Sequence, residues 1–195
     1  MNLLNSPSVA ILTGASGVIG KEIVKTLIAR QMHVAASARS VSRLEKLVRE
    51  NFPSFETQIS IYEVDVRNPE EVKRMVDFSS SIGRIELLIN GAGNYGSIGL
   101  VRDVPPIEWR NAFETNMFGA YNCVYNVLRY MIPQVSGRII NIAGGGSTGP
   151  LQNLSSYAAS KASLVRLTDS MAEEVKPYAI KVNAILPGAI DSPMQ

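Results

Sequence analysis

Tyr157 and Lys161 are the residues of this chain whose types and spacing best suit chemistry. Four residues apart, they lie on one face of a helix, about one turn from each other. A phenol has an ordinary pKa of about 10, so it is a poor acid near neutral pH. An ammonium group beside it lowers that pKa by stabilising the phenolate. Alone the pair is weak evidence, because any helix can carry this spacing, but together with the nucleotide-type glycine turn at residues 13–20 it indicates a nicotinamide-dependent carbonyl or alcohol oxidoreductase.

A glycine-rich turn far upstream supplies the second candidate site. Residues 13–20 read Thr-Gly-Ala-Ser-Gly-Val-Ile-Gly and follow the apolar run at residues 9–12. Glycines let the backbone turn tightly and approach a pyrophosphate, which sits at the positive N-terminal end of the following helix. The alternative is a plain strand–helix turn. The residues that we predict to bind a dinucleotide here are Gly14, Ser16, Gly17, Val18, Ile19 and Gly20.

The elements that must position these residues alternate along the whole chain. Apolar runs predict strands at residues 9–12, 33–38, 59–64, 85–89, 138–142 and 180–186. Helical patterns lie between them at residues 20–30, 41–50, 69–78, 106–131 and 155–176. Strict alternation predicts a doubly wound parallel sheet of Rossmann type, in a single α/β domain over residues 1–195. Ligands of such sheets bind beyond the carboxyl ends of the strands.

Residues at the end of the second predicted strand bear on the choice of cofactor. An acid there usually accepts hydrogen bonds from the ribose hydroxyls of a cofactor without a 2′-phosphate. Here Ala38 is followed by Arg39 and Ser40, with no acid before Glu45. Arg39 could bind a 2′-phosphate through charge-assisted hydrogen bonds, which favours NADP(H) over NAD(H). The alternative is that Arg39 is an ordinary solvated surface charge.

Two further groups follow the third and fourth predicted strands. Asp65 and Val66 are placed to contact an adenine, and the small residues from Asn90 through Ala92 and Gly93 let the backbone pass close to a ribose. Each group alone is a routine turn or helix cap. Because they follow successive strands, together they support a cofactor site.

Composition excludes other classes of function. Of the 195 residues, 46% are hydrophobic and 18% charged, as in a globular protein, and the net charge is +2 with no long run of one sign. A nucleic-acid-binding protein would concentrate basic residues on one face. Cys123 is the only cysteine, and we find neither a signal-peptide pattern nor an apolar run of membrane-spanning length. We expect a cytoplasmic protein with no nucleic-acid partner, no membrane partner and no metal site.

With these residues in hand, the chain resembles the short-chain dehydrogenase/reductase family over residues 9–194. The matching motifs are the glycine turn, Asp65, Asn90-Gly91-Ala92-Gly93, Asn116, Tyr157 with Lys161, and Pro187-Gly188. The resemblance implies that Tyr157 protonates the carbonyl oxygen in reduction, or acts as base in alcohol oxidation. It implies that Lys161 lowers the tyrosine pKa and holds the nicotinamide ribose, and that Asn116 holds a water linking the lysine to solvent. On its own, Asn116 reads as an ordinary polar helix residue.

The resemblance also assigns the loop after the last predicted strand. Pro187 and Gly188 match the loop over the nicotinamide, and Ser192 stands where the family commonly has a threonine that bonds the carboxamide. These residues complete the predicted cofactor site.

Three departures from the family pattern follow. Gly17 is the middle glycine of the turn, and Val18 stands where the family usually has it, a spacing that resembles the extended branch with its nucleotide-sugar epimerases and dehydratases. Thirteen residues before Tyr157, where the family has a catalytic serine, stands Gly144. Losing one such donor costs about 10²–10³ in rate, unless Ser147, Thr148, a backbone N–H or a water replaces it.

The third departure is the end of the sequence. Family members typically continue with a substrate-covering helix and a seventh strand, whereas this sequence stops at Gln195. The given residues therefore predict a fold without that helix and strand, with the sixth strand at an open edge of the sheet. Either the sequence is a fragment or truncated product, or a partner subunit covers the edge.

The leading hypothesis is an NADP(H)-dependent reductase of a small-molecule carbonyl substrate, with 3-oxoacyl thioesters as one candidate. The alternatives are a weak or inactive nicotinamide-binding sensor or subunit, and an epimerase or dehydratase of the extended branch. The two long helices carry more apolar residues than one sheet-facing stripe needs, which predicts a homodimer or homotetramer or, alternatively, packing within the subunit. The residues concerned are Phe113, Met117, Tyr121, Val124 and Leu128.

Overall fold

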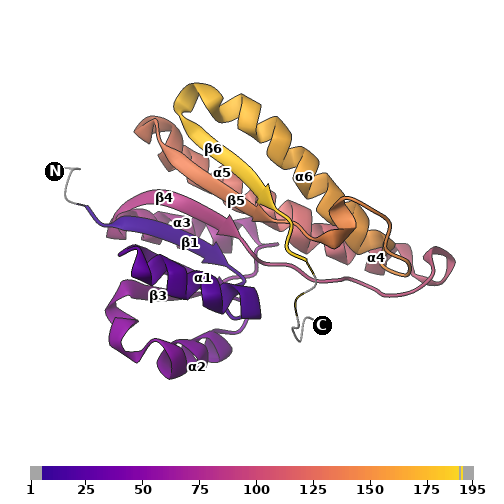
Figure 1. Cartoon of the computed structure of the whole chain (residues 1–195), viewed down its shortest axis with the longest axis horizontal. Coiled ribbons are helices and arrows are strands. Elements are labelled where there is room, and N and C mark those ends of the chain that lie inside the picture. The colour runs from indigo at the N-terminus through magenta and orange to yellow at the C-terminus, as the bar shows by residue number, and fades with distance from the viewer. Residues whose placement is uncertain (1–5, 189, 191–195) are drawn as a thin grey trace.

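The computed structural model describes residues 6–188 and 190, and it contains one parallel sheet between two layers of helices (Figure 1). The strands are β1 (Ser8–Thr13), β2 (His33–Ala38), β3 (Ile59–Glu63), β4 (Arg84–Asn90), β5 (Gly137–Ile142) and β6 (Ile180–Ile185). The helices are α1 (Val18–Ala29), α2 (Val41–Asn51), α3 (Pro69–Ile82), α4 (Pro106–Phe113), α5 (Gly119–Gln134) and α6 (Ser155–Val175).

The strand order is β3-β2-β1-β4-β5-β6, and every neighbouring pair is parallel. The order reverses between β1 and β4, which is the point where doubly wound sheets bind ligands. The carboxyl ends of the strands lie on one side of the molecule, on the right in Figure 1, together with α4 and the start of α6. The predicted Rossmann-type α/β fold is confirmed.

Helix boundaries follow from local side chains. Ser40 caps α2 by accepting a hydrogen bond from the backbone N–H of Arg43. Asn68 caps α3 through the N–H groups of Glu70 and Glu71, and Pro69 supplies a fixed φ at the first helical position. The helix predicted over residues 106–131 is interrupted, because a π-helical turn, Glu114–Phe118, separates α4 from α5. Such turns are often found at functional sites.

Two apolar clusters hold the layers together, one on each face of the sheet. One cluster joins β1, β4 and β5 to α3, α5 and α6, and the other joins the sheet to α1 and α2. Val124 of α5 is 2% exposed and belongs to the first cluster, so it is not part of an outward-facing stripe. Tyr121 of the same helix is exposed.

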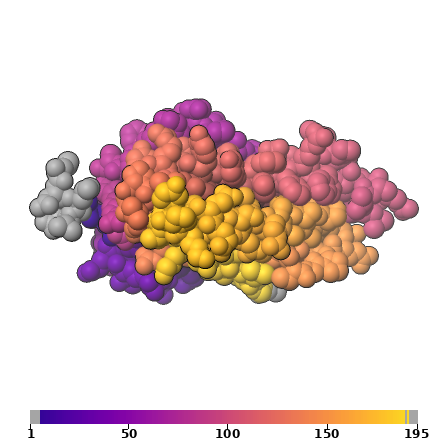
Figure 2. Space-filling view, turned by 90° about the horizontal axis from the view of Figure 1, so that it is seen from above, coloured from indigo at the N-terminus to yellow at the C-terminus, as the bar shows by residue number. Residues whose placement is uncertain are grey.

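The sheet face beside α1 is open over its β4–β6 half. An apolar groove of about 760 Å³ lies there, between Ile19 and Ile23 of α1 and strand residues that include Leu87, Ile140 and Ile185. Within the described residues, β6 pairs only with β5 and is therefore an edge strand. The atoms of β6 and α6 form the outer surface at this end of the molecule (Figure 2). No helix of the described part of the chain is long and apolar enough to cross a membrane.

Candidate active site

A cleft of about 440 Å³ lies at the carboxyl ends of the strands, between α1 and the start of α6. Its walls come from the loops after β4, β5 and β6. The lining residues are Ile19, Gly91, Gly93, Tyr95, Ile142, Ala143, Gly144, Gly145, Leu151, Leu154, Tyr157, Lys161, Pro187, Gly188 and Ile190. The cleft therefore brings together the predicted tyrosine–lysine pair and parts of the predicted cofactor site.

Tyr157 and Lys161 enter the cleft from the first two turns of α6. Tyr157 is 7% exposed and Lys161 is 4% exposed. The Lys161 ammonium donates a hydrogen bond of 2.7 Å to the carbonyl oxygen of Ile142 at the end of β5, and it lies 5.9 Å from the centre of the Tyr157 ring. The carbonyl partly offsets the cost of burying the charge and fixes the lysine beside the phenol.

Burial acts on both groups in the direction of their neutral forms. It raises the pKa of Tyr157 above its ordinary value, and the neighbouring Tyr95 adds to this effect. It lowers the pKa of Lys161 to about 8. The expected lowering of the Tyr157 pKa by Lys161 is thus not found in the protein alone, because burial is the larger effect. The first turn of a helix favours the phenolate, which works against burial.

Asn116 occupies the π-helical turn and joins three parts of the site. Its side-chain oxygen accepts from the backbone N–H of Asn94 at 2.9 Å, and its amide group donates to the Asn94 carbonyl and to the Ser160 hydroxyl, also at 2.9 Å. The Ser160 hydroxyl in turn donates to the carbonyl of Tyr157. Asn116 therefore holds the loop after β4 against the helix that carries the tyrosine.

Gly93 marks a place where the backbone passes close to the catalytic side chains. A β-carbon at Gly93 would lie 3.1 Å from the Asn116 side-chain oxygen and 3.3 Å from the Lys161 nitrogen. Because no side chain stands there, the backbone can pass this close to the two polar groups, each of which already has a hydrogen-bond partner: the Ile142 carbonyl for Lys161 and the Asn94 N–H for Asn116.

The glycine turn has the form expected of a pyrophosphate site. Gly14 has a φ of +70°, and a β-carbon on it would lie 2.6 Å from the carbonyl oxygen of Gly91, so only glycine fits. Gly17 begins α1 without a side-chain cap, which leaves the first N–H groups of the helix for a ligand. Val18 is exposed, so it does not fill the turn from inside. With glycine at position 17 and valine at position 18, the turn thus still leaves room for a pyrophosphate.

A buried threonine that the sequence reasoning did not single out ties this turn to the next loop. The Thr13 hydroxyl accepts hydrogen bonds from the backbone N–H groups of Gly91 and Ala92 at 3.1 and 3.2 Å. It therefore couples the ends of β1 and β4, where the two halves of the sheet meet.

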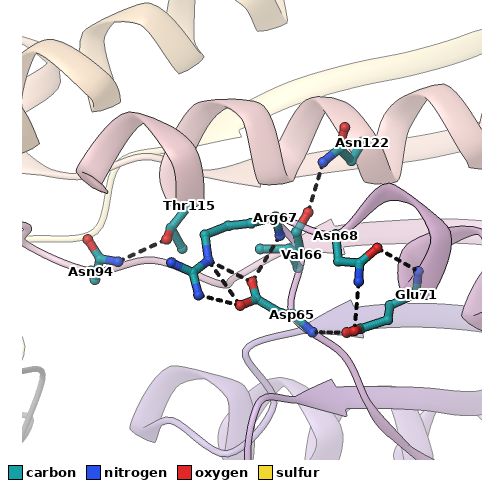
Figure 3. Close-up of polar contacts among 8 residues, drawn as sticks. All are labelled: Asp65, Val66, Arg67, Asn68, Glu71, Asn94, Thr115 and Asn122. Atoms are coloured by element: carbon teal, nitrogen blue, oxygen red, sulfur yellow. Dashed lines mark hydrogen bonds and ion pairs between the residues drawn. The ribbon is translucent and has the colours of Figure 1, made fainter. Parts of the chain in front are cut away.

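Asp65 lies at the expected place after β3, but its carboxylate already has a partner (Figure 3). The Nε atom of Arg67 is 2.9 Å from both carboxylate oxygens, and this hydrogen bonding holds the pKa of Asp65 below its ordinary value. The Asp65 backbone N–H donates to Glu71, and the Val66 carbonyl accepts from Asn122. Any adenine contact of Asp65 would have to share the carboxylate with Arg67.

Arg39 is exposed directly after β2, as the sequence predicts. It is followed by Ser40, which caps α2 and lies 3.2 Å from the Ser42 hydroxyl. An anion beside Arg39 would therefore also meet the positive N-terminal end of α2.

The side chain of Asn90 has a structural role, which leaves its backbone for the predicted approach to a ribose. Its side chain points into the sheet, where its amide donates to Asn141 at 2.8 Å, and Asn141 donates to Thr168 of α6. All three are buried. This amide chain holds β4, β5 and α6 together, so a cofactor contact at Asn90 would have to come from its backbone.

Comparison with known proteins decides the family. A family model described as short chain dehydrogenase matches residues 8–195. The chain belongs to the short chain dehydrogenase family. The 3-oxoacyl-[acyl-carrier-protein] reductase FabG of Staphylococcus aureus is 35% identical over 193 residues, which cover 95% of this chain and 75% of that relative.

Two solved structures of short chain dehydrogenases carry nicotinamide cofactors. ElxO with NADP bound matches with a TM-score of 0.90 and 28% identity, over 96% of this chain and 75% of that one. NAD+-bound xylitol dehydrogenase matches with a TM-score of 0.86 and 33% identity, over 94% of this chain and 70% of that one. The family uses both cofactors, and its members act on alcohols and carbonyl groups.

In this short chain dehydrogenase, the Tyr157 hydroxyl lies close to the space that a side chain at position 144 would need. A β-carbon at Gly144 would lie 2.6 Å from the Tyr157 hydroxyl oxygen. The Ser147 hydroxyl donates to the Gly144 carbonyl at 2.6 Å, and Thr148 is exposed. Neither hydroxyl lines the cleft, so neither replaces the missing side chain in this structure.

Of the loop predicted to lie over the nicotinamide, Pro187 and Gly188 line the cleft. Ser192 lies outside the described residues.

Sequence reasoning missed Tyr95, whose ring packs edge-on against Tyr157, with ring centres 4.9 Å apart at an angle of 64°. No motif marks Tyr95. The only sequence signal is its place within the loop that follows β4, two residues after Gly93.

Proposed function

We propose that this short chain dehydrogenase is an NADP(H)-dependent reductase of carbonyl compounds, with 3-oxoacyl thioesters as one candidate substrate class. The observation that carries the proposal is the burial of the Tyr157 phenol beside the Lys161 ammonium, at the wall of a cleft that adjoins an uncapped helix N-terminus. When bound, the nicotinamide supplies the hydride that adds to the carbonyl carbon.

Tyr157 then donates its proton to the carbonyl oxygen, which becomes the alcohol hydroxyl. Lys161 stabilises the phenolate that is left and holds the cofactor ribose across Gly93. Asn116 fixes the distance between the two walls of the cleft through its hydrogen bonds to Asn94 and Ser160. Each of these roles uses a group whose position is set by a backbone or side-chain partner.

A direct test compares the chain with its Tyr157→Phe variant on a panel of ketones and 3-oxoacyl thioesters, following the loss of NADPH absorbance. We expect turnover by the wild type and a loss of at least about 10²-fold in the variant, because the proton donor is removed. Equal rates would contradict the proposal.

Cofactor choice rests on Arg39. Because Arg39 stands at the N-terminal end of α2 and no acid follows it in the sequence before Glu45, we expect preference for NADPH over NADH by about tenfold or more. Titration of both cofactors measures it, and Arg39→Ala should remove most of the preference. Equal affinities in the wild type would refute the role of Arg39.

A second candidate, a nicotinamide-binding sensor or subunit with little turnover, is favoured by one observation. The cleft has no side chain at Gly144 to support the substrate oxygen. The same substrate panel separates the two functions. A sensor would bind the cofactor, but its turnover rate would be the same in the wild type and in the Tyr157→Phe variant.

We further propose a homodimer or homotetramer that acts in the cytoplasm. Phe118, Tyr121 and Tyr125 form an exposed stripe at three- and four-residue spacing along α5 and its π-helical start, which fits a second helix better than water. The single buried cysteine fits a reducing compartment. Light scattering after size exclusion tests the assembly, and a monomer would contradict it.

A further inference from the structure

The polar side chains of the cleft are few. Among the described residues that line it, only Tyr95, Tyr157 and Lys161 have polar side chains. The Lys161 nitrogen is already bonded to the Ile142 carbonyl. Support for a substrate oxygen must therefore come from the two phenols or from the backbone.

Tyr95 is held firmly, although it lies in a loop. On one side, the backbone N–H and carbonyl of Asn94 are both bonded to the Asn116 side chain, and the Asn94 amide donates to the Thr115 hydroxyl (Figure 3). On the other side, Gly96 has a φ of +67°, and a β-carbon on it would lie 2.9 Å from the Ala112 side chain. The tyrosine is therefore positioned before a substrate arrives.

The ring of Tyr95 brings a second phenol beside the first. The rings touch edge to face with centres 4.9 Å apart, and Tyr95 is half-buried at the mouth of the cleft. No described residue forms a side-chain hydrogen bond with either hydroxyl. Because both phenols line the cleft, their hydroxyl groups are available to a substrate oxygen bound there.

The space for a serine side chain at position 144 is limited by the Tyr157 hydroxyl. Because a β-carbon at Gly144 would lie 2.6 Å from the Tyr157 hydroxyl oxygen, a side chain there would require the phenol to move away from its present position. A hydrogen-bond donor for the substrate oxygen therefore has to come from another wall of the cleft. The loop after β4 supplies such a donor, the hydroxyl of Tyr95.

We propose that Tyr95 donates a hydrogen bond to the substrate carbonyl oxygen, taking the part that a serine at position 144 would play. This inference rests on the proposed reductase function. A preorganised donor that acts on an oxygen as negative charge develops typically contributes about 10²–10³ in rate. Among the described residues, the apolar side chains of Leu151, Leu154 and Ile190 also line the cleft, which favours a ketone whose flanking groups carry no charge where they meet these side chains.

The test replaces Tyr95 with phenylalanine, which keeps the ring and removes the hydroxyl. We expect kcat for a ketone substrate to fall by about 10²-fold, with the KM changed far less, because the bond strengthens in the transition state. The NADPH dissociation constant and the melting temperature should stay at their wild-type values. Tyr178→Phe, at an exposed tyrosine that lines no proposed site or interface, is the matched control and should leave all four quantities unchanged.

Each outcome decides between distinct conclusions. A Tyr95→Phe rate within about threefold of wild type overturns the inference while the reductase function stands. If the Tyr95→Phe variant also loses cofactor affinity and melting temperature, the inference is overturned too, because Tyr95 then only supports the structure of the site. A wild type no faster than Tyr157→Phe overturns the proposed function and this inference with it.

Discussion

Replacement of Gly144 by serine separates what the family pattern and this structure each predict. The family pattern predicts a gain, since the substitution restores the missing donor, which is worth about 10²–10³ in rate. The structure predicts a loss, because a β-carbon at position 144 would lie 2.6 Å from the Tyr157 hydroxyl oxygen. Close-packed interiors keep such atoms about 3.5 Å apart, so the phenol has to move by roughly 0.5–1 Å.

The cost of that movement falls on catalysis rather than on folding. The hydroxyl is the end of a side chain that can turn away, so we expect the melting temperature to change little. A misplacement of about 1 Å costs about 10²-fold in rate, and kcat/KM for ketone reduction should fall by about 10–10²-fold. Gly145→Ser is the matched control, because nothing lies within 4 Å of a β-carbon there. A Gly144→Ser enzyme faster than wild type would refute the argument.

Three further predictions concern the surroundings of the pair. The kcat/KM for reduction should fall as the pH rises through about 8, because burial lowers the pKa of Lys161 to that value and the ammonium is lost above it; a pH–rate profile flat to about pH 10 would contradict this. Asn116→Ala should lower the free energy of unfolding by about 1–3 kcal/mol in urea titrations, since it leaves buried partners unpaired, and more than Asn122→Ala, which removes one bond to Val66. Arg67→Ala should cost about 1 kcal/mol or less at pH 7, because the ion pair with Asp65 is partly exposed. Since the pKa of Asp65 is lowered in the folded state, that cost should vanish as acid protonates the carboxylate, which unfolding midpoints at pH 7 and pH 3 compare.

The strands and the order of elements could be predicted because their signals are local. Apolar runs of strand length and caps such as Ser40 and Asn68 act within a few residues of each other. The break between α4 and α5 could not, because the residues of the π-helical turn have ordinary helix propensity. Its cause is tertiary: the side chain of Asn116 bonds to Asn94 and Ser160, which are distant in the sequence.

The same distinction runs through the site. Tyr157 and Lys161 were predictable from a spacing of one helical turn, and Arg39 from its place after a strand. The direction of the Asn90 side chain was not, because it depends on Asn141, which lies in the next strand along the chain, 51 residues later, and is its neighbour in the sheet. The partner of Asp65 lies only two residues away, yet a sequence does not tell whether Arg67 turns toward the carboxylate or toward solvent. Tyr95 was missed for a related reason, since only the folded chain brings it against Tyr157.

The electrostatics of the pair favour one direction of reaction. Burial raises the pKa of Tyr157, so near neutral pH the phenol keeps its proton and is ready to donate it. Burial also lowers the pKa of Lys161, but to about 8, so near neutral pH the ammonium is still mostly present beside the phenol. A base would need Tyr157 as phenolate, which the same burial disfavours. In the protein alone, the phenol thus carries the proton that the proposed reduction needs, and the Lys161 ammonium held by the Ile142 carbonyl is the group placed to stabilise the phenolate once that proton has left.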